Sequence, residues 1–316
     1  MKGQSLYICY NTFVKNKQYI VGVLCLITMF IILINMAIVA SPQYAATFFA
    51  QGKTVEQVVT KYNNAPKQAK VKLLLVPGHE PDFGGTEYKG IIERDLNVAL
   101  VNKIAEDLKN NSKFEIIIAR DFDNWNSDLK KYFDANMSGI EKWRNDQEKE
   151  MEALVKDGKI ELVTNVEHNT VPKGPALRLY GINKWADENA VDVTLHIHFN
   201  DNPKINGKPK YSGFSIYVPE RQYSNSTSSI ELANGLMKEL GNISGVSTLE
   251  QESTGVIQDQ DLIAIGRYNT ADSLVALIEY AYIYEPKLKT KTLRADFMDK
   301  MASSTVTALT RFFENR

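Results

Sequence analysis

Val71-Lys-Leu-Leu-Leu-Val-Pro-Gly-His79 is the stretch of sequence that decides the fold. Its first six residues are almost all apolar, as expected of a strand buried on both faces of a parallel sheet. Pro77-Gly78 ends the strand, so we expect His79 at the carboxyl end of the sheet. Open α/β sheets bind their ligands at this end of their strands.

Helical and extended patterns alternate along the chain on the C-terminal side of this strand. The apolar spacing predicts helices over 93–110, 176–190, 229–240 and 295–313, and strands over 114–119, 191–199, 213–218 and 274–283. This alternation predicts an α/β fold, a single domain with a mostly parallel central sheet flanked by helices. We expect the domain to span residues 71–316.

One segment, 124–174, interrupts the alternation and is interpreted as an insertion at an edge of the sheet. It contains a charged helical pattern over 137–156 and a short strand pattern over 160–166. A charged helix of this kind is most simply a solvated surface. A second interpretation is that the helix, which carries Glu148, Glu150 and Glu152, lies over the functional site and restrains it until an activating protein partner binds.

The N-terminal part contains an uncharged apolar run, Ile20 to Ala40, which is 21 residues long. At 1.5 Å rise per residue, a helix of this length crosses a hydrocarbon core of about 30 Å. A cleaved signal peptide is the alternative, but its apolar region is only about 7–15 residues, so an uncleaved transmembrane anchor is favoured. Residues 41–70 are interpreted as a juxtamembrane spacer with a short helical pattern at 55–62.

Charge and cysteine content restrict location and partners. Lys2, Lys15 and Lys17 precede the apolar run without an acidic residue, so residues 1–19 should be a cytoplasmic tail and the domain extracytoplasmic on a single-pass cell-membrane protein. The rest of the chain has 34 basic and 38 acidic residues, which argues against nucleic acid as a partner. Cys9 and Cys25 lie outside the domain, so a metal there must use His and carboxylate ligands.

His79 and Glu93 are the first two candidate ligands. His79 follows the strand-ending turn, and Glu93 lies fourteen positions later in the first turn of the amphipathic helix over 93–110. Taken alone, His79 could be structural and Glu93 a carboxylate that stabilises the positive end of the helix dipole. Two imidazoles and one carboxylate, however, can hold Zn²⁺ and leave one coordination position open.

The later candidates lie on two predicted strands. His196 and His198 alternate along one strand and face the same way, about 6–7 Å apart, so only one of them is expected to be a ligand. Glu279 lies within the apolar pattern of the strand over 274–283. Burial of an unpaired carboxylate is unfavourable, so Glu279 requires either a hydrogen-bond partner or a chemical role.

Five motifs occur in the order found in one enzyme family: Leu75-Val-Pro-Gly-His79, Glu93-Arg-Asp-Leu-Asn97, Ala119-Arg-Asp121, His196-Ile-His-Phe-Asn200 and Leu277-Ile-Glu-Tyr280. From about Val71 to the C-terminus, the chain resembles the zinc-dependent N-acetylmuramoyl-L-alanine amidases, the cell-wall autolysins. Each motif alone has low specificity, whereas five in order on the expected elements are fairly specific.

The resemblance implies zinc-dependent hydrolysis of the amide bond between N-acetylmuramic acid and L-alanine in peptidoglycan. It implies that His79, Glu93 and His198 hold Zn²⁺, since the third ligand of the family precedes a residue-Asn pair, as His198 precedes Phe199-Asn200. It also implies that Glu279 is the catalytic glutamate, which transfers the proton of water to the leaving nitrogen.

The sequence departs from the family in three places. Glu80-Pro-Asp-Phe83 intervenes before Gly84-Gly85, Val76 stands where an Asp is common, and His196 replaces a small residue. We expect His196 and Asn200 to lie next to the ligands, with His196 hydrogen-bonding the substrate or a ligand carboxylate. His168 lies in the insertion and is expected away from the site.

Two other functions are compatible with the sequence. One is a non-catalytic peptidoglycan-binding or scaffold protein of the same fold, which the altered loop after His79 would favour. The other is a zinc amidase that acts on another extracytoplasmic peptide. Neither explains the four chemical residues better than peptidoglycan amidase activity does.

Overall fold

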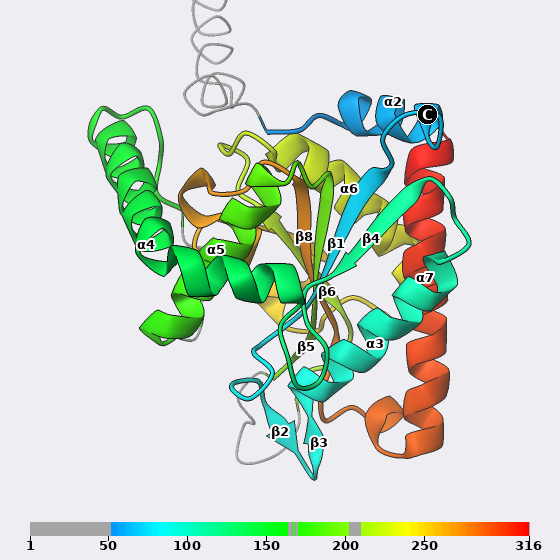
Figure 1. The fold of residues 1–316 in the computed structure, drawn as a ribbon. Coiled ribbons are helices and arrows are strands. Elements are labelled where there is room, and N and C mark those ends of the chain that lie inside the picture. Colours follow the sequence, from blue (N-terminus) through cyan, green and yellow to red (C-terminus); the bar gives the residue numbers. More distant parts are fainter. Residues whose placement is uncertain (1–51, 164–165, 167, 169, 202–209, 316) are drawn as a thin grey trace, which may run out of the picture. The chain divides into compact units, whose positions relative to one another are not determined.

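The computed structural model describes residues 52–163, 166, 168, 170–201 and 210–315. Within them a six-stranded sheet has the order β4-β1-β5-β8-β6-β7 (Figure 1). The strands are β1 (Val71–Pro77), β4 (Phe114–Ile118), β5 (Val193–Asn200), β6 (Ser215–Pro219), β7 (Val256–Asp259) and β8 (Leu274–Tyr282). The first four in the sheet are parallel, and β6 pairs antiparallel with β8 and parallel with β7. The predicted α/β fold with a mostly parallel sheet is confirmed.

The helices of the described residues are α2 (Val55–Asn64), α3 (Glu93–Leu108), α4 (Ser127–Lys156), α5 (Lys173–Glu188), α6 (Ser226–Leu240) and α7 (Lys291–Glu314). Short 3-10 turns are η2 (Glu250–Glu252), η3 (Ile263–Ile265), η4 (Arg267–Asn269) and η5 (Pro286–Leu288). A two-stranded hairpin, β2 (Glu87–Tyr88) with β3 (Ile91–Ile92), leads into α3. The helices predicted outside the insertion all form, and their ends shift by only a few residues.

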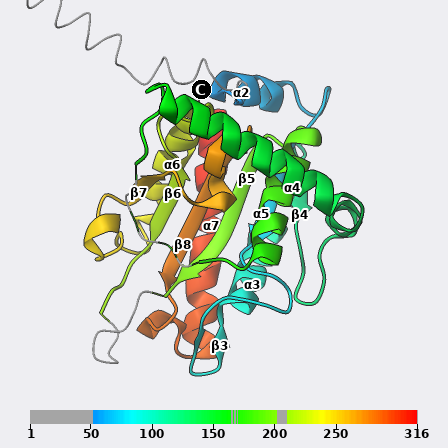
Figure 2. The ribbon, with the colours of Figure 1, turned by 90° about the vertical axis from the view of Figure 1, so that its left-hand side faces the viewer.

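The two faces of the sheet pack in different hydrophobic cores, because side chains alternate between the faces. Val193, Leu195 and Ile197 of β5 pack in the larger core with α3, α6 and α7. His196 and His198 line a cavity on the other face, to which residues of α5 and of the inserted helix α4 also contribute. Both helices lie on that side of the sheet (Figures 1 and 2). Figure 2 looks onto this second face, with α4 in front. The candidate site therefore lies on the face that the inserted helix covers.

Three elements differ from the sequence-based expectations. The inserted helix begins at Ser127 rather than at 137, because the Asn126 side chain caps it by accepting a hydrogen bond from Asp128 N. Residues 160–163 form no strand; Ile160 instead packs in a small core with Met151 of α4. The edge strand β7 was not predicted, since half of its four residues are polar and the run is too short to show alternation.

The folded part begins before the expected boundary at Val71. Helix α2, within the predicted spacer, is fixed by a capping box between Thr54 and Gln57. It buries Val58 and Tyr62, and the Tyr62 ring stacks on Phe313 of α7 at a centroid distance of 4.8 Å. Helix α2, which lies within the predicted spacer, is therefore part of the folded domain.

The predicted cytoplasmic tail, 1–19, and the predicted anchor, 20–40, lie outside the described residues. Among the residues that the structure describes, no helix combines the length and apolarity needed to span a bilayer.

Candidate metal centre

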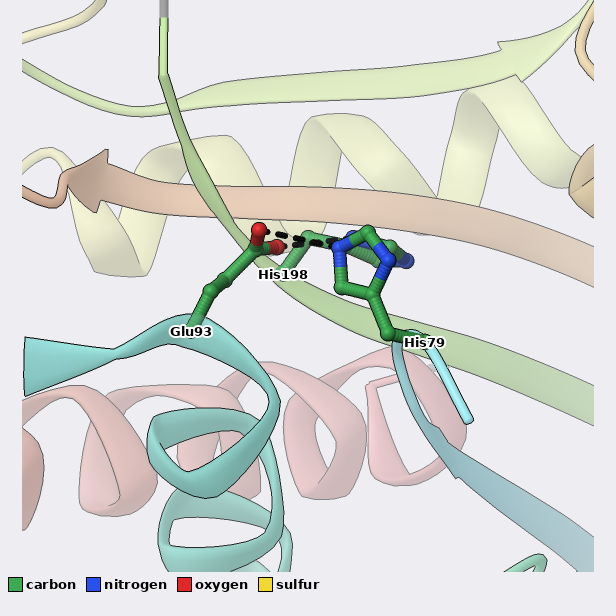
Figure 3. A group of neighbouring side chains, drawn as sticks. All are labelled: His79, Glu93 and His198. Atoms are coloured by element: carbon green, nitrogen blue, oxygen red, sulfur yellow. Dashed lines mark hydrogen bonds and ion pairs between the residues drawn. The ribbon is translucent and has the colours of Figure 1, made fainter. Parts of the chain in front are cut away.

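Three side chains from separate parts of the chain meet at the carboxyl end of β1 and β5 (Figure 3). His79 Nε2 lies 2.9 Å from Glu93 Oε2, and His198 Nδ1 lies 3.2 Å from Glu93 Oε1. One ligand atom from each residue lies within 4.8 Å of the others. The spatial convergence that the sequence pattern predicts is thus observed, whereas the role of these residues as metal ligands stays a prediction.

The backbone places His79 in an unusual conformation. His79 has a φ of 64°, in the left-handed region that few residues other than glycine adopt. The preceding Gly78 lies so close to His198 that a Cβ at position 78 would be 2.2 Å from the imidazole Cε1. Glycine is therefore required at position 78, because any side chain would occupy the space of the second imidazole.

Arg120, two residues after the end of β4, stabilises this turn. It is almost fully buried, and its guanidinium donates to the carbonyls of Pro77, Gly78 and His79 at 3.1, 2.5 and 2.7 Å. Asn97 of α3 also donates to the Gly78 carbonyl, at 3.2 Å. Burial lowers the pKa of Arg120 to about 10, which leaves the guanidinium charged at neutral pH. Sequence reasoning noted both residues within motifs but assigned neither a role.

Glu93 is the first residue of α3, and its carboxylate is the common partner of both imidazoles. Oε2 also accepts from the Thr86 backbone N–H at 3.0 Å, and Oε1 from that of Phe199 at 3.3 Å. Burial alone would raise the pKa of Glu93, but hydrogen bonds to His198 and His79 bring that pKa well below its usual range. Glu93 is thus held as a charged carboxylate.

Glu279 of β8 is paired in register with His198 of β5. Its Oε2 is buried and has no hydrogen-bond partner among the described residues. Burial raises the pKa of Glu279 well above its usual value, and the negative charges of Glu93 and Glu252 raise it further. A carboxylate with one buried oxygen that lacks a partner among the described residues, in register with His198 and near the charge of Glu93, is the arrangement expected where a cation and a reacting proton complete the site.

A family model described as N-acetylmuramoyl-L-alanine amidase matches residues 73–311. The chain belongs to this amidase family. The matched range includes His79, Glu93, His198 and Glu279, and the match supports peptidoglycan amidase activity.

Solved structures show the same fold at low sequence identity. An N-acetylmuramoyl-L-alanine amidase from Clostridium difficile 630 is 16% identical, with 78% of this chain and 98% of that chain covered and a TM-score of 0.50. The amidase Ami1 from Mycobacterium smegmatis is 14% identical, with coverage of 78% and 99% and a TM-score of 0.52. The CwlD amidase from Clostridioides difficile, in complex with the GerS lipoprotein, is 16% identical, with coverage of 78% and 100% and a TM-score of 0.51. No curated protein matches this chain.

The donor set of the amidase fits Zn²⁺. Two nitrogens and one carboxylate oxygen are ligands that zinc prefers, and tetrahedral zinc sites place such atoms about 3.3–3.5 Å apart. The observed contacts of 2.9 and 3.2 Å are close to those separations, and the three ligand atoms all lie within 4.8 Å of one another. The His79 side chain is 28% exposed while that of Glu93 is 6% exposed, so one side of the triad is open to solvent. Catalytic zinc sites keep such an open side.

His196, His168 and Asn200 are not part of the His79–Glu93–His198 triad. His196 is 1% exposed, and neither ring nitrogen has a hydrogen-bond partner among the described residues, so it contacts no ligand carboxylate. Asn200 donates to Glu252 at 2.9 Å rather than to the triad. His168 Nε2 lies 2.7 Å from Asp259 Oδ2, and its side chain lines the same cavity as His79 and His198.

The loop that departs from the family pattern is anchored by an ion pair. Glu80, next to His79, receives a bidentate contact from Arg178 of α5, with Nε and Nη2 at 2.5 and 2.6 Å from its two oxygens. Such fork geometry is specific and comparatively strong. The altered loop is therefore fixed to α5, and this contact keeps His79 in place in the amidase.

Proposed function

We propose that this chain hydrolyses the amide bond between N-acetylmuramic acid and L-alanine in peptidoglycan, with Zn²⁺ as its cofactor. The observation that carries the proposal is the convergence of His79, Glu93 and His198 within 4.8 Å, with Glu279 in register opposite His198. Membership in the amidase family supports an amide as the bond that is cleaved.

Each residue of the site has its own role in the proposed hydrolysis. His79, Glu93 and His198 would hold Zn²⁺, which supplies Lewis acidity that lowers the pKa of water and polarises a carbonyl. Glu279 Oε2 has no hydrogen-bond partner among the described residues, so it can accept the proton of the attacking water. The same carboxyl group then donates that proton to the leaving nitrogen of L-alanine, which returns Glu279 to its charged form. Arg120 keeps His79 in position during this cycle through the carbonyls of the Pro77-Gly78-His79 turn.

Digestion of purified peptidoglycan tests this proposal. Full-length protein in detergent should bind one zinc per chain, measured by elemental analysis, and should release new alanine amino termini. A chelator should stop the release and added zinc should restore it. Zinc-loaded protein that binds peptidoglycan but releases no alanine amino termini would overturn the proposal and favour the scaffold function.

We also propose the location that the N-terminal sequence indicates. Residues 20–40 would anchor the protein in the cell membrane with residues 1–19 in the cytoplasm, so that the amidase domain is extracytoplasmic and faces its substrate. An activating protein partner is a further part of this proposal, which the complex of the CwlD amidase with the GerS lipoprotein supports.

A further inference from the structure

A cavity of about 930 Å³ opens beside the candidate metal centre. Its wall includes His79 and His198, and it extends between the sheet, α5, the inserted helix α4 and the η3–η4 turns. Ligand sites have volumes of about 300–1,000 Å³, so this cavity can hold several residues of a peptide. A substrate whose scissile bond lies at the triad would place a neighbouring group in it.

His196 gives the inner wall of the cavity two unpaired polar atoms. The side chain lines the cavity and is 1% exposed, yet Nδ1 and Nε2 have no hydrogen-bond partner in the described part of the chain. Buried polar atoms without partners are rare because each loses its hydrogen bonds to water. An imidazole in this state is suited to bond a ligand, since its two nitrogens offer one donor and one acceptor.

Two arginines give the outer wall unpaired donors that carry positive charge. Arg144 of α4 and Arg267 of η4 both line the cavity, and the Nε of each is buried without a partner among the described residues. Arg144 Nη1 lies 2.7 Å from Glu148, which leaves its Nε free, whereas Arg267 Nη2 lies 3.6 Å from Asp261. The contact of Arg267 is too long for a hydrogen bond, so its charge is only loosely compensated.

The two guanidinium groups are held in place by a pair of tyrosines. The rings of Tyr180 and Tyr268 are stacked with an interplanar angle of 5°, Arg144 lies 6.0 Å from the Tyr180 ring centroid, and Arg267 lies 4.8 Å from that of Tyr268. Tyr268 has a φ of 62°, which is strained for a residue other than glycine. Backbone strain of this kind clusters at ligand sites, where it fixes side chains before the ligand binds.

The charge of the donors indicates which part of the substrate enters the cavity. N-acetylated sugars carry no charge, and the lactyl group of the intact substrate is an amide, so the glycan side offers no anion. The peptide side offers carboxylates, which arginine binds by charge-assisted hydrogen bonds. An acidic peptide is therefore the chemical class that fits the cavity, because its carboxylate can accept from the two guanidinium groups and its backbone amide groups can pair with the donor and the acceptor of His196.

We propose that this cavity binds the peptide part of the substrate, that Arg144 and Arg267 recognise a free carboxylate on it, and that His196 hydrogen-bonds a peptide group nearer the scissile amide. This inference rests on the proposed amidase function and specifies its substrate class. It also gives the insertion a role, because Arg144 lies on the inserted helix α4.

A pair of synthetic muropeptides tests the inference. The two are identical except that the glutamate after L-alanine carries either its free carboxylate or a carboxamide. Zinc-loaded full-length protein should cleave the carboxylate form with at least a tenfold higher kcat/KM. Arg267→Gln and Arg144→Gln should each bring this ratio toward one. Lys142→Gln, on the same helix but with a side chain 77% exposed, is the matched control and should keep the wild-type ratio.

Two readouts separate the parts of the inference. His196→Gln should lower kcat/KM for both substrates and keep their ratio, which an unaltered kcat/KM would contradict. Carboxylate recognition would be overturned if the wild-type protein cleaved both muropeptides with nearly equal kcat/KM. It would also be overturned if the arginine variants kept the wild-type preference for the carboxylate form.

Calorimetry separates failure of this inference from failure of the proposed function. Binding of a free alanyl-glutamyl peptide and of its amidated analogue requires no cleavage. The acidic peptide should bind wild-type protein at least tenfold more tightly, and Arg267→Gln should remove the difference. If neither muropeptide is cleaved but this binding preference holds, the proposed function fails and the acidic peptide site stands. Equal binding of both peptides would reject the site even if cleavage occurs.

Discussion

Glu279 and His198 are register partners on neighbouring parallel strands, so the carboxylate lies directly across from one of the three candidate ligands. On its other side, Glu279 is in register with Ser215 of the antiparallel strand β6. Backbone hydrogen bonds on both sides therefore fix the position of Glu279, while its Oε2 has no partner among the described residues. A site built on central strands is positioned more precisely than one built on loops.

The first prediction concerns this carboxylate. Glu279→Gln should lower kcat on peptidoglycan by at least about a hundredfold, the range of general acid–base catalysis, because an amide cannot accept the proton of water. Zinc content should stay at one per chain, because Glu279 is not in the triad. Release of alanine amino termini measures activity, and Glu115→Gln, an exposed carboxylate on β4, is the control. A Glu279→Gln protein that digests peptidoglycan at the wild-type rate would exclude the mechanism.

The second prediction concerns the close approach of Gly78 to His198. Gly78→Ala should weaken zinc binding by about 10–100-fold, as displacement of groups that support metal ligands does, because its Cβ would require His198 to move. Competition with a fluorescent zinc chelator measures the affinity. Gly235→Ala, in α6 with no atom within 4 Å of the added Cβ, should leave affinity unchanged. Equal zinc affinity in both variants would show that the turn tolerates a side chain.

The third prediction concerns Arg120. Arg120→Met should lower the free energy of unfolding by at least about 3 kcal/mol, since it leaves several buried carbonyls of the Pro77-Gly78-His79 turn unpaired. Denaturant unfolding followed by circular dichroism measures the loss. Arg221→Met, which removes an arginine with a 58% exposed side chain, should change stability by less than about 0.5 kcal/mol. Indistinguishable unfolding curves for the two variants would contradict the role assigned to Arg120.

The central sheet and the triad could be predicted because their signals are local. The apolar run before Pro77 marks a buried strand, and His79 and Glu93 each stand at the end of an element, where parallel α/β sheets bring separate segments together. The alternation of His196 and His198 restricted the third ligand to one of two. The family resemblance then selected His198, which the structure places with the other two.

The remaining features depend on contacts that no local pattern records. Arg120 resembles any polar residue after a strand, and only the fold shows which carbonyls it reaches. Arg144 and Arg267 lie more than a hundred positions apart and line one cavity through the packing of α4 against η4. The charged pattern of α4 predicted a solvated helix, and it gave no sign that Arg144 would face inward.

The fourth prediction concerns the N-terminal segment. Full-length protein should stay in the membrane fraction after an alkaline carbonate wash, and mass spectrometry should find residues 1–40 intact. Replacement of Ile31 and Ile32 by arginine should release the protein from the membrane fraction, because each charge at the centre of a spanning helix costs about 2.5–3.5 kcal/mol. Thr28→Leu, which makes the run more apolar, is the control and should retain the protein in the membrane. A mature protein that begins after Ala40 would show that the segment is a cleaved signal.

The last prediction concerns the pH dependence of stability and involves a carboxyl group in the last turn of α5. Asp187 Oδ1 accepts a hydrogen bond from the backbone N–H of Asp272 at 2.9 Å. Burial, together with the negative charge of Asp272, raises the pKa of Asp187 to about 8. Between its unfolded value of about 4 and this folded value, the folded protein binds more protons than the unfolded chain. Stability from this group is therefore fully present below about pH 4 and is lost as pH rises toward 8.

Asp187→Asn should remove this contribution, because the amide oxygen can still accept the Asp272 hydrogen bond but cannot ionise. The free energy of unfolding of the wild type should fall relative to that of the variant as pH rises from 5 to 8, by up to about 1.4 kcal/mol for each pH unit. Denaturant unfolding at a series of pH values, at fixed zinc concentration, measures this difference. Asp134→Asn is the matched control, because Asp134 is an exposed carboxylate that pairs with Lys130 on α4. Its free energy of unfolding should change with pH in the same way as that of the wild type. If the free energy of unfolding of Asp187→Asn changes with pH in the same way as that of the wild type, Asp187 is not protonated in the folded protein. Its charge must then be balanced by neighbouring cations such as Lys53 and Lys184.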